Sequence, residues 1–242
     1  MSSHDATRAR FAATAERVAE HGARQVATVR EELTRLLSLR GDERALDVGT
    51  GAGVLALAIA PLVGEVIGVD LVPELLAAAR RGAPANANFV EGDAEKLPFD
   101  AGAFDLVACR RTLHHVHRPE LAVAEIARVT APGGRIVVND QIAPSDPLAG
   151  IELDRFERAR DPSHTRTLSD ADFRGVFDSN GLVLEHSESK IHRRPLEYYL
   201  DLAGCAGELR EHALALAPSG REAYSVDIAW YVLHKASASR RA

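Results

Sequence analysis

The stretch Ala45-Leu46-Asp47-Val48-Gly49-Thr50-Gly51-Ala52-Gly53, followed by Gly68-Val69-Asp70, decides the fold. An apolar run ends in an acid, three glycines alternate with small residues, and a second acid comes about 20 residues later. This pattern predicts a strand, a tight turn, a helix and a second strand. A carboxylate at the end of that second strand is well placed to bind the hydroxyl groups of a ribose.

The glycine spacing separates two kinds of nucleoside site. Gly49 and Gly51 suit a chain that turns directly from a strand into a helix, where a Cβ would obstruct the turn. Gly53 allows the following helix to lie close to the sheet or to a ligand. Dinucleotide sites use G-x-G-x-x-G, but Val54 stands where the third glycine would be. The pattern is D-x-G-x-G-x-G, headed by Asp47; a tight turn without any ligand is the alternative.

Composition and charge narrow the class of protein. A chain of 242 residues with 46% apolar and 26% charged residues fits one α/β domain with additions. The formal charge of −6 argues against binding to nucleic acid through a general electrostatic field. No apolar run approaches a membrane span, and the start lacks the apolar segment of a signal peptide. Cys109 and Cys205 form neither a disulfide framework nor a metal-binding spacing, so we expect a cytoplasmic protein.

Apolar periodicity predicts an alternation of strands and helices after two N-terminal helices that break near Gly22. Such alternation implies a parallel sheet with helices on both faces. The predicted strands cover residues 43–49, 65–70, 88–91, 104–110, 135–140, 182–191 and 225–235. The predicted helices cover residues 54–62, 73–81, 119–130, 151–160, 169–181 and 193–217.

Two acids follow predicted strands, where ligands of open α/β sheets bind. Asp70 ends the second strand, and the alternative to ribose binding is a cap on the helix that begins at Pro73. Leu71 beside it can supply an apolar wall. Gly92-Asp93-Ala94 ends the third strand; as an isolated motif it is typical of a turn.

The fourth strand leads into Arg110-Arg111-Thr112-Leu113-His114-His115-Val116. Arg110 can neutralise an anion, and His114 and His115 are candidates for accepting a proton because imidazole titrates near neutral pH. Neighbouring side chains diverge, so we expect one histidine to face the site; local hydrogen bonding of both is the alternative. His117 raises the idea of a metal site, but adjacent histidines seldom converge on one ion, and we predict no metal.

The glycine loop resembles motif I of the class I S-adenosylmethionine-dependent methyltransferases. Leu97-Pro98-Phe99 and the Pro132-Gly133-Gly134 loop are also similar to the methyltransferase type 11 branch, which includes ubiquinone/menaquinone-biosynthesis enzymes. The resemblance implies that S-adenosylmethionine is the cofactor and S-adenosylhomocysteine the product. It implies cofactor contacts by Asp47, Gly49, Thr50, Gly51, Gly53, Asp70, Leu71, Asp93, Ala94 and Arg110. It places His114, His115 and Arg110 near the reacting methyl group.

The resemblance also implies a Rossmann-like sheet of seven strands in the order 3-2-1-4-5-7-6, mostly parallel with the last strand antiparallel. We expect one domain over 1–242: a helical cap (1–40), a cofactor-binding core (41–140), an acceptor-side insertion (141–168), the C-terminal half (169–236) and a frayed tail (237–242). The expected activity is methyl transfer to an O, N or C atom of a small molecule by a monomer or homodimer. Alternatives are a cofactor-binding protein without methyl transfer, a nicotinamide-dependent dehydrogenase and a noncatalytic interaction protein.

Residues outside the motifs are expected to choose the acceptor. Asn139 and Asp140, at the end of the fifth strand, either line the acceptor side or form turns. His164, Arg166, Arg193 and Arg194 either recognise an anionic substrate or form a solvated face.

Overall fold

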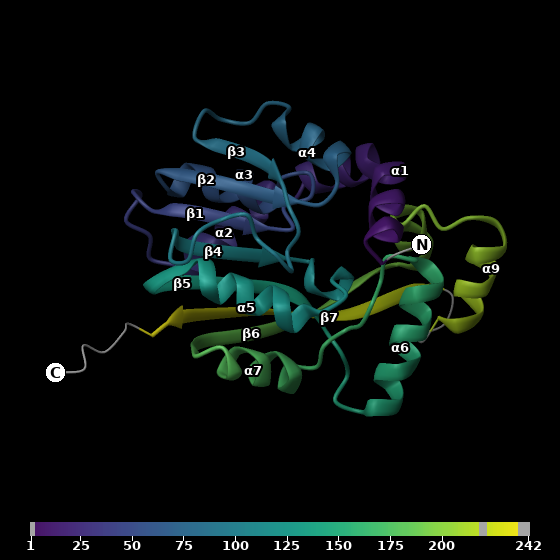
Figure 1. Cartoon of the computed structure of the whole chain (residues 1–242). Helices are drawn as coiled ribbons and strands as arrows, with labels where there is room; N and C mark the ends of the chain where they lie inside the picture. Colours follow the sequence, from purple (N-terminus) through teal and green to yellow (C-terminus); the bar gives the residue numbers. More distant parts are fainter. Residues whose placement is uncertain (1–2, 218–221, 237–242) are drawn as a thin grey trace.

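The computed structural model describes residues 3–217 and 222–236, and its centre is a seven-stranded sheet (Figure 1). The strand order is β3-β2-β1-β4-β5-β7-β6, with β7 antiparallel to both of its neighbours and the other pairs parallel. This confirms the predicted order and the antiparallel last strand. The strands are β1 (Arg44–Val48), β2 (Glu65–Asp70), β3 (Ala87–Glu91), β4 (Phe104–Arg110), β5 (Thr130–Ile142), β6 (Leu182–Pro195) and β7 (Ala223–Lys235).

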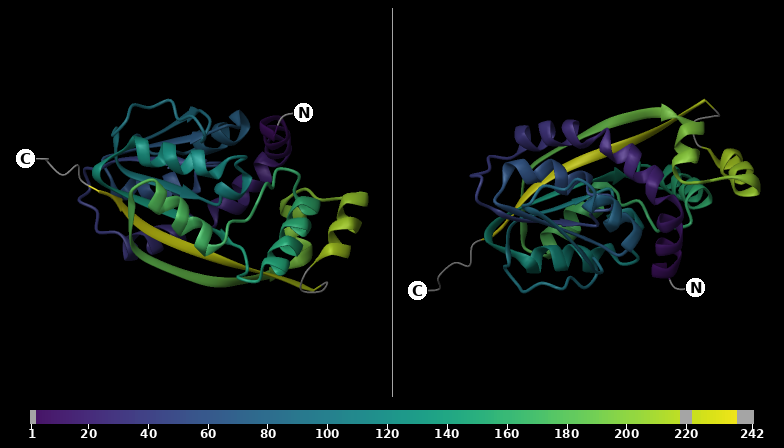
Figure 2. Two further views of the ribbon diagram at one scale, coloured as in Figure 1. Left: turned by 60° about the horizontal axis from the view of Figure 1, so that its bottom comes forward. Right: turned by 90° about the horizontal axis from the view of Figure 1, so that it is seen from above.

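Helices cover both faces of the sheet, as the alternation of elements predicts (Figures 1 and 2). Leu46 and Val48 of β1 share an apolar cluster with α5 and α7, whereas Ala45 shares one with α2, α3 and α4. Burial on both faces explains why the central strands are apolar throughout. The helices are α1 (Ser3–Ala23), α2 (Val26–Leu36), α3 (Val54–Ile59), α4 (Pro73–Arg80), α5 (Pro119–Val129), α6 (Pro147–Arg160), α7 (Asp170–Ser179), α8 (Leu196–Leu202) and α9 (Gly207–Leu216), with the 3-10 turns η1 (Ala60–Leu62) and η2 (Leu113–His115).

A further layer lies at one end of the sheet, where α6, α8 and α9 pack on β7 (Figure 2). Pairing of β6 with β7 continues to Pro195 and Ala223, beyond the last pair of β5 and β7 at Ile142 and Asp227. The extended pair supports this layer through a separate apolar cluster. Helix α1 packs against α4 at the same end. None of the described helices has the length and apolar character needed to cross a membrane.

One predicted helix is only partly confirmed. The prediction of a single helix over 193–217 fails at its start, because β6 continues through Pro195, and two short helices, α8 and α9, then cover most of the segment. Arg193 pairs with Ser225 across the sheet, and this long-range pairing overrides local helical periodicity. Gly204 and Gly207 have φ of +71° and +58°, which separates α8 from α9.

The segment 131–134, which precedes the fifth predicted strand, is an irregular part of β5. Thr130 pairs with Phe104 and Arg135 pairs with Leu106, so the intervening residues bulge from the ladder. The remaining predicted elements are present with ends shifted by a few residues. The predicted frayed tail, 237–242, lies outside the described residues. The proposed division into cap, core and insertion stays a prediction.

Candidate active site

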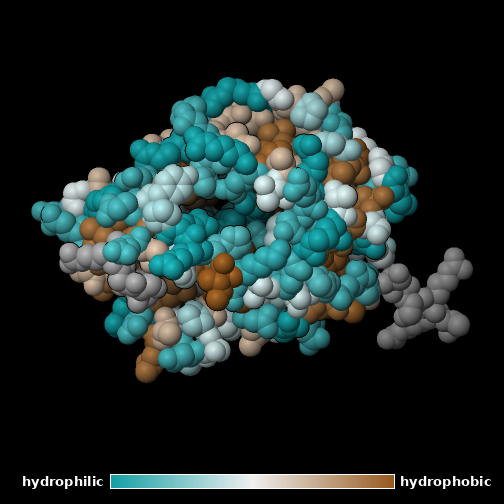
Figure 3. Space-filling view, turned by 180° about the vertical axis from the view of Figure 1, so that it is seen from behind, coloured by the Kyte–Doolittle hydropathy of each residue, from teal (hydrophilic) through white to brown (hydrophobic). Residues whose placement is uncertain are grey.

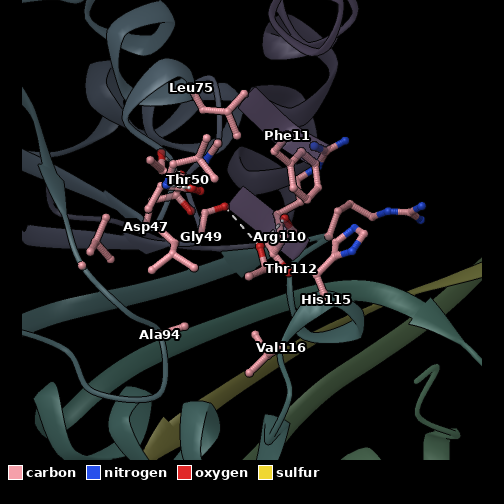
Figure 4. Close-up of a pocket in the computed structure, with 18 of the residues that line it drawn as sticks. Phe11, Asp47, Gly49, Thr50, Leu75, Ala94, Arg110, Thr112, His115 and Val116 are labelled. Carbon is pink, nitrogen blue, oxygen red and sulfur yellow. Dashed lines mark hydrogen bonds between the residues drawn. The ribbon is translucent and has the colours of Figure 1, made fainter. Parts of the chain in front are cut away.

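A cavity of about 200 Å³ lies at the carboxyl ends of β1, β2, β3 and β4, under helix α1 (Figure 4). The glycine loop after β1 forms one side of it, and Phe11 and Val18 of α1 form the other. Predicted site residues from four separate motifs therefore meet in one place. The position agrees with the rule that open α/β sheets bind ligands beyond the carboxyl ends of their strands.

The three glycines of the loop have different roles. Gly49, Gly51 and Gly53 all have positive φ, at +67°, +55° and +86°. A Cβ on Gly49 would lie 2.2 Å from a side-chain carbon of Thr112, whereas one on Gly51 would meet no protein atom within 4 Å. A Cβ on Gly53 would meet Ala79 at 3.0 Å, so Gly53 lets α3 lie close to α4 and does not line the cavity.

Asp47 is the next-to-last residue of β1, and its carboxylate is buried beside the cavity. Its Oδ2 accepts hydrogen bonds from Thr50 Oγ1 at 2.7 Å and from Ala56 N at 2.9 Å. Its Oδ1 is buried with no hydrogen-bond partner among the described residues. Burial raises the pKa of Asp47 to about 7, against the opposing effect of the two hydrogen bonds. Asp47 therefore brings an unused acceptor to the cavity.

Asp70 connects the end of β2 to the glycine loop. Its Oδ2 accepts from Gly51 N at 2.7 Å, and its Oδ1 accepts from Val72 N at 2.9 Å. Burial raises its pKa, while these backbone hydrogen bonds favour the ionised form. A carboxylate accepts about four hydrogen bonds, so lone pairs remain on both oxygens for a ligand. Asp70 does not cap α4, because the N-cap is Val72 and no side chain caps that helix, and its two backbone hydrogen bonds are compatible with a ligand role.

The far side of the cavity comes from the loop after β3. Asp93 Oδ1 accepts from Glu95 N at 2.8 Å, and its Oδ2 lies 3.6 Å from His4 Nε2 of α1. Ala94 and Leu71 also line the cavity. Sequence motifs did not indicate Phe11 and the other lining residues of α1, because the helix carries no motif and joins the cavity only through folding.

A second cavity of about 450 Å³ adjoins the first. It lies between α1 and α2 on one side and β6 and β7 on the other, and Phe11, Arg110, Arg111 and His115 line both cavities. The rear face of the molecule also shows a hollow bordered mainly by hydrophilic residues (Figure 3). The shared wall contains the fourth-strand residues that sequence analysis placed near the reacting atom.

His115 is fixed by a chain of hydrogen bonds from a neighbouring loop. Its Nδ1 lies 3.0 Å from Ser163 Oγ, which donates its hydrogen to Asp161 Oδ1 at 2.5 Å. Because a hydroxyl has only one hydrogen, His115 Nδ1 must donate to Ser163, which leaves Nε2 as an acceptor. Burial lowers the pKa of His115 well below its usual value, with His114 adding to the effect. The ring is therefore neutral and Nε2 can accept a hydrogen bond, but the lowered pKa makes it a weak base.

His114 is held in a separate buried pair and lines only the second cavity. Its Nδ1 lies 2.5 Å from Asp140 Oδ1, and Asp140 Oδ2 accepts from Leu113 N at 2.8 Å. Burial would raise the pKa of Asp140, but His114 and Arg111 hold it below its usual value. His115 is thus the only one of the two that borders both cavities.

Arg110 and Arg111 bring guanidinium groups to the wall between the cavities. Burial lowers the pKa of Arg110 to about 10, and the nearby charge of Arg111 contributes. Arg111 has φ of +55°, a costly conformation for a residue with a side chain, and its amide donates to Asn139 O at 2.7 Å. Arg110 Nε and Arg111 Nη1 are buried without hydrogen-bond partners among the described residues.

The other candidate residues lie elsewhere. His117 is exposed, His164 Nε2 contacts Asp154 Oδ1 at 2.9 Å, and Arg166 pairs on the surface with Glu120. Of the four proposed anion-recognition residues, Arg194 alone lines a described cavity. In the described part of the chain, no group of three His, Cys, Asp or Glu side chains is arranged to hold a metal ion.

We expect the His115 ring to be neutral and protonated on Nδ1 throughout the neutral range. Its Nε2 should gain a proton only well below pH 6.5, because burial disfavours the charged ring. Imidazole nitrogen shifts in a histidine-labelled sample measure this, with His115→Gln assigning the signal and His117→Gln as the exposed control. A His115 ring protonated on Nε2 at pH 7 would contradict the hydrogen-bond assignment.

Comparisons with known proteins agree with this geometry. A family model described as a methyltransferase domain matches residues 46–138. The demethylmenaquinone methyltransferase of Clavibacter sepedonicus is 30% identical over 204 residues, which cover 78% of this chain and 80% of that protein. The chain therefore belongs to the family that the methyltransferase-domain model describes. It is also 39% identical over 163 residues to the uncharacterized methyltransferase YcgJ of Bacillus subtilis, covering 66% of this chain and 64% of YcgJ.

Solved structures extend the likeness to the whole fold. The crystal structure of YcgJ covers 87% of this chain and 99% of its own, with a TM-score of 0.82 and 26% identity. The [4+2]-cyclase SpnF covers 88% of this chain and 81% of its own, with a TM-score of 0.67 and 20% identity. The second likeness concerns the fold alone.

Proposed function

We propose that this member of the methyltransferase family transfers the methyl group of S-adenosylmethionine to an O, N or C atom of a small molecule. The observation that carries the proposal is the convergence of Asp47, Gly51 and Asp70 on one cavity, with Asp47 Oδ1 buried and unpaired. An acceptor atom of this kind suits the ammonium group of an amino acid, whereas a pyrophosphate would require donors.

The residues of the first cavity fit the parts of this cofactor. Asp47 Oδ1 would accept from its ammonium group and Asp70 from its ribose hydroxyls. Asp93 and the backbone of Ala94 would bind the adenine, with Leu71 as an apolar wall. Arg110 would offset its carboxylate. When bound, the cofactor supplies a methyl group on a positively charged sulfur, which is already a strong electrophile.

The protein's own contribution is positioning, exclusion of water and acceptance of a proton. Phe11 of α1 covers the wall between the cavities, with its ring centroid 5.0 Å from that of His115. His115 Nε2 is available to accept a proton from the acceptor, and His114 can do so from the second cavity. Proximity and orientation contribute about 7–11 kcal/mol to reactions of this kind, so a strong base is not required.

Calorimetry with S-adenosylhomocysteine and NAD tests the proposal. Binding of S-adenosylhomocysteine and not of NAD is expected, because Val54 replaces the third glycine of the dinucleotide pattern. Incubation with methyl-labelled S-adenosylmethionine and a small-molecule extract should place the label in an acceptor. Label that never leaves the cofactor would favour a non-methylating role, and failure of both nucleosides to bind would favour a noncatalytic protein. A cytoplasmic location and a monomeric or dimeric state stay predictions.

Binding of S-adenosylhomocysteine should weaken as the pH falls below about 7, by up to tenfold per pH unit. Burial raises the pKa of Asp47 to about 7, and only the ionised carboxylate can pair with the ammonium group. Acid protonates this carboxylate and therefore opposes binding. Calorimetry between pH 5.5 and 8 measures the slope, and Asp47→Asn should bind weakly with a flatter profile. An equal slope in both proteins would show that another group titrates.

A further inference from the structure

The second cavity concentrates positive charge in a chain whose formal net charge is −6. Seven arginine and lysine residues line it, against two acids, Glu32 and Asp161. Both acids are already paired. Glu32 lies 3.1 Å from Lys190, and Asp161 lies 2.5 Å from Arg10 and 3.8 Å from Arg160. Among the residues that the structure describes, the lining cations without a paired carboxylate are Arg24, Arg110, Arg111 and Arg194.

Arg111 and Arg194 are less exposed than Arg24, which lies at the surface, and therefore face the inner part of the cavity. Within residues 3–217 and 222–236, neither has a carboxylate within 4 Å of its guanidinium. Arg111 Nη1 is buried without a hydrogen-bond partner, and Arg194 lies 5.2 Å above the ring of Tyr199. Burial lowers the pKa of Arg194, and the charge of Arg111 lowers it further. Arg111 is near enough to the buried Asp140 to lower the pKa of that carboxyl, but among the described residues neither guanidinium forms a direct ion pair with a carboxylate.

The cofactor's carboxylate does not account for the charge of Arg194. Arg194 lines the second cavity and not the first, whereas Arg110 lines both. One carboxylate in the first cavity can be offset by Arg110 on the shared wall. The charge of Arg194 then still faces the space where an acceptor would lie.

The backbone conformation of Arg111 also supports a functional role for this residue. Arg111 is the only non-glycine residue with positive φ in the described part of the chain. Residues held in such a conformation cost of order 1–3 kcal/mol and cluster at functional sites. The conformation places Arg111 on the wall of both cavities.

The uncharged lining of the cavity is mixed: four histidines, Gln25, Thr28 and Asn139 stand beside apolar and aromatic side chains. Phe11 and Val18 of α1, Tyr199 and Leu202 of α8, and Ile228 and Trp230 of β7 line it. A cavity of about 450 Å³ is of the size that holds small molecules, and its lining offers both apolar surface and positive charge.

We propose that the methyl acceptor is a small organic anion, a carboxylate or phosphate on an apolar body, whose anionic group is bound by Arg111 and Arg194. Only the description of this anion as the methyl acceptor rests on the proposed function, because the anion site itself is defined by the second cavity. Arg194 is a specificity-determining residue in this assignment, and it does not touch the cofactor.

The test compares matched anions and alcohols on the protein saturated with S-adenosylhomocysteine. The probes are benzoate, 2-naphthoate, octanoate and phenyl phosphate, with benzyl alcohol, 2-naphthylmethanol and octanol as neutral partners. At least one anion should bind tenfold or more tightly than its alcohol at low salt. The preference should fall about tenfold in Arg194→Gln and in Arg111→Gly, which also removes the backbone strain.

Arg193→Gln is the matched control, since Arg193 is the exposed neighbour of Arg194 on β6 and lines neither cavity. It should retain the full preference, and all three variants should melt near the wild type. Unaltered binding of S-adenosylhomocysteine by Arg194→Gln shows that the first cavity is intact.

The proposal would be overturned by equal binding of anions and alcohols, by no binding of any anion, or by equal losses in Arg193→Gln and Arg194→Gln. A preference that disappears when S-adenosylhomocysteine binds would assign the guanidiniums to the cofactor and also overturn it. If S-adenosylhomocysteine itself does not bind the wild type, the proposed function fails. The anion preference of the second cavity is then measured without it.

Discussion

Asp70→Ala should weaken binding of S-adenosylhomocysteine about 100-fold while the sheet remains folded. The wild-type carboxylate accepts one backbone hydrogen bond on each oxygen and keeps a lone pair on each for a ribose hydroxyl. A hydrogen bond to a charged group contributes about 1.5–3 kcal/mol, and about 1.4 kcal/mol corresponds to a tenfold change in affinity. Loss of two such bonds, each at the lower end of this range, gives the expected effect of about 100-fold, which calorimetry measures directly.

The variant also removes the acceptor for Gly51 N and Val72 N, so a small fall in melting temperature is expected. Asp178→Ala serves as the control, because Asp178 is exposed on α7 and lines neither cavity. It should bind S-adenosylhomocysteine as the wild type does. Wild-type affinity in Asp70→Ala, with a normal melting curve, would mean that the ribose does not lie at this carboxylate.

The core of the fold and the first cavity could be predicted from local sequence. The turn after β1 depends on positive φ at Gly49, Gly51 and Gly53, and glycine is the residue that adopts such angles without strain. The ends of parallel strands meet at one edge, so acids that follow separate strands converge. For this reason the sequence predicts that Asp47 and Asp70 lie near one another, and both line the first cavity.

The second cavity could not be predicted in this way. Ser163 is 48 residues from His115 in sequence, and their hydrogen bond depends on the loop after α6 folding back beneath η2. Arg194 reaches the cavity because β6 extends past the predicted strand end and pairs with β7. Local periodicity carries no information about such long-range pairing, and it assigned Arg194 to a helix.

Glu157→Gln should lower the free energy of unfolding by about 3 kcal/mol, through loss of a charge in a buried network. Glu157 is fully buried on α6. Its Oε2 accepts from Arg160 Nη2 at 2.8 Å and from Arg160 Nε at 3.0 Å, and Tyr199 and Tyr224 donate their hydroxyls to Oε1 at 2.9 and 2.5 Å. Breaking a buried pair typically costs about 3–5 kcal/mol, and Asp161, 3.8 Å from Arg160, retains part of the compensation.

A loss of that size corresponds to a fall of about 6–12 °C in melting temperature for a chain of this length. Chemical denaturation measures the free energy, and Glu152→Gln, on the exposed face of the same helix, should change it little. Burial alone would raise the pKa of Glu157, but Arg160 holds it below the usual value. The ionised carboxylate therefore stabilises the fold above pH 4.5, and this contribution is lost as the pH falls through the lowered pKa. Glu157→Gln should lack that loss.

The same network supports one wall of the second cavity, so Glu157→Gln should affect binding in the second cavity and not in the first. The rings of Tyr199 and Tyr224 stack with centroids 4.6 Å apart, and Arg194 lies over the ring of Tyr199. Loosening this wall should weaken the preference for anions, whereas none of these residues lines the first cavity. Affinity for S-adenosylhomocysteine should therefore stay within about twofold of the wild type, because a mutation usually changes the energetics of a distant site that shares no contacts with it by less than about 0.5 kcal/mol. If Glu157→Gln were as stable as Glu152→Gln, water or a repacked Arg160 would have to replace the lost charge.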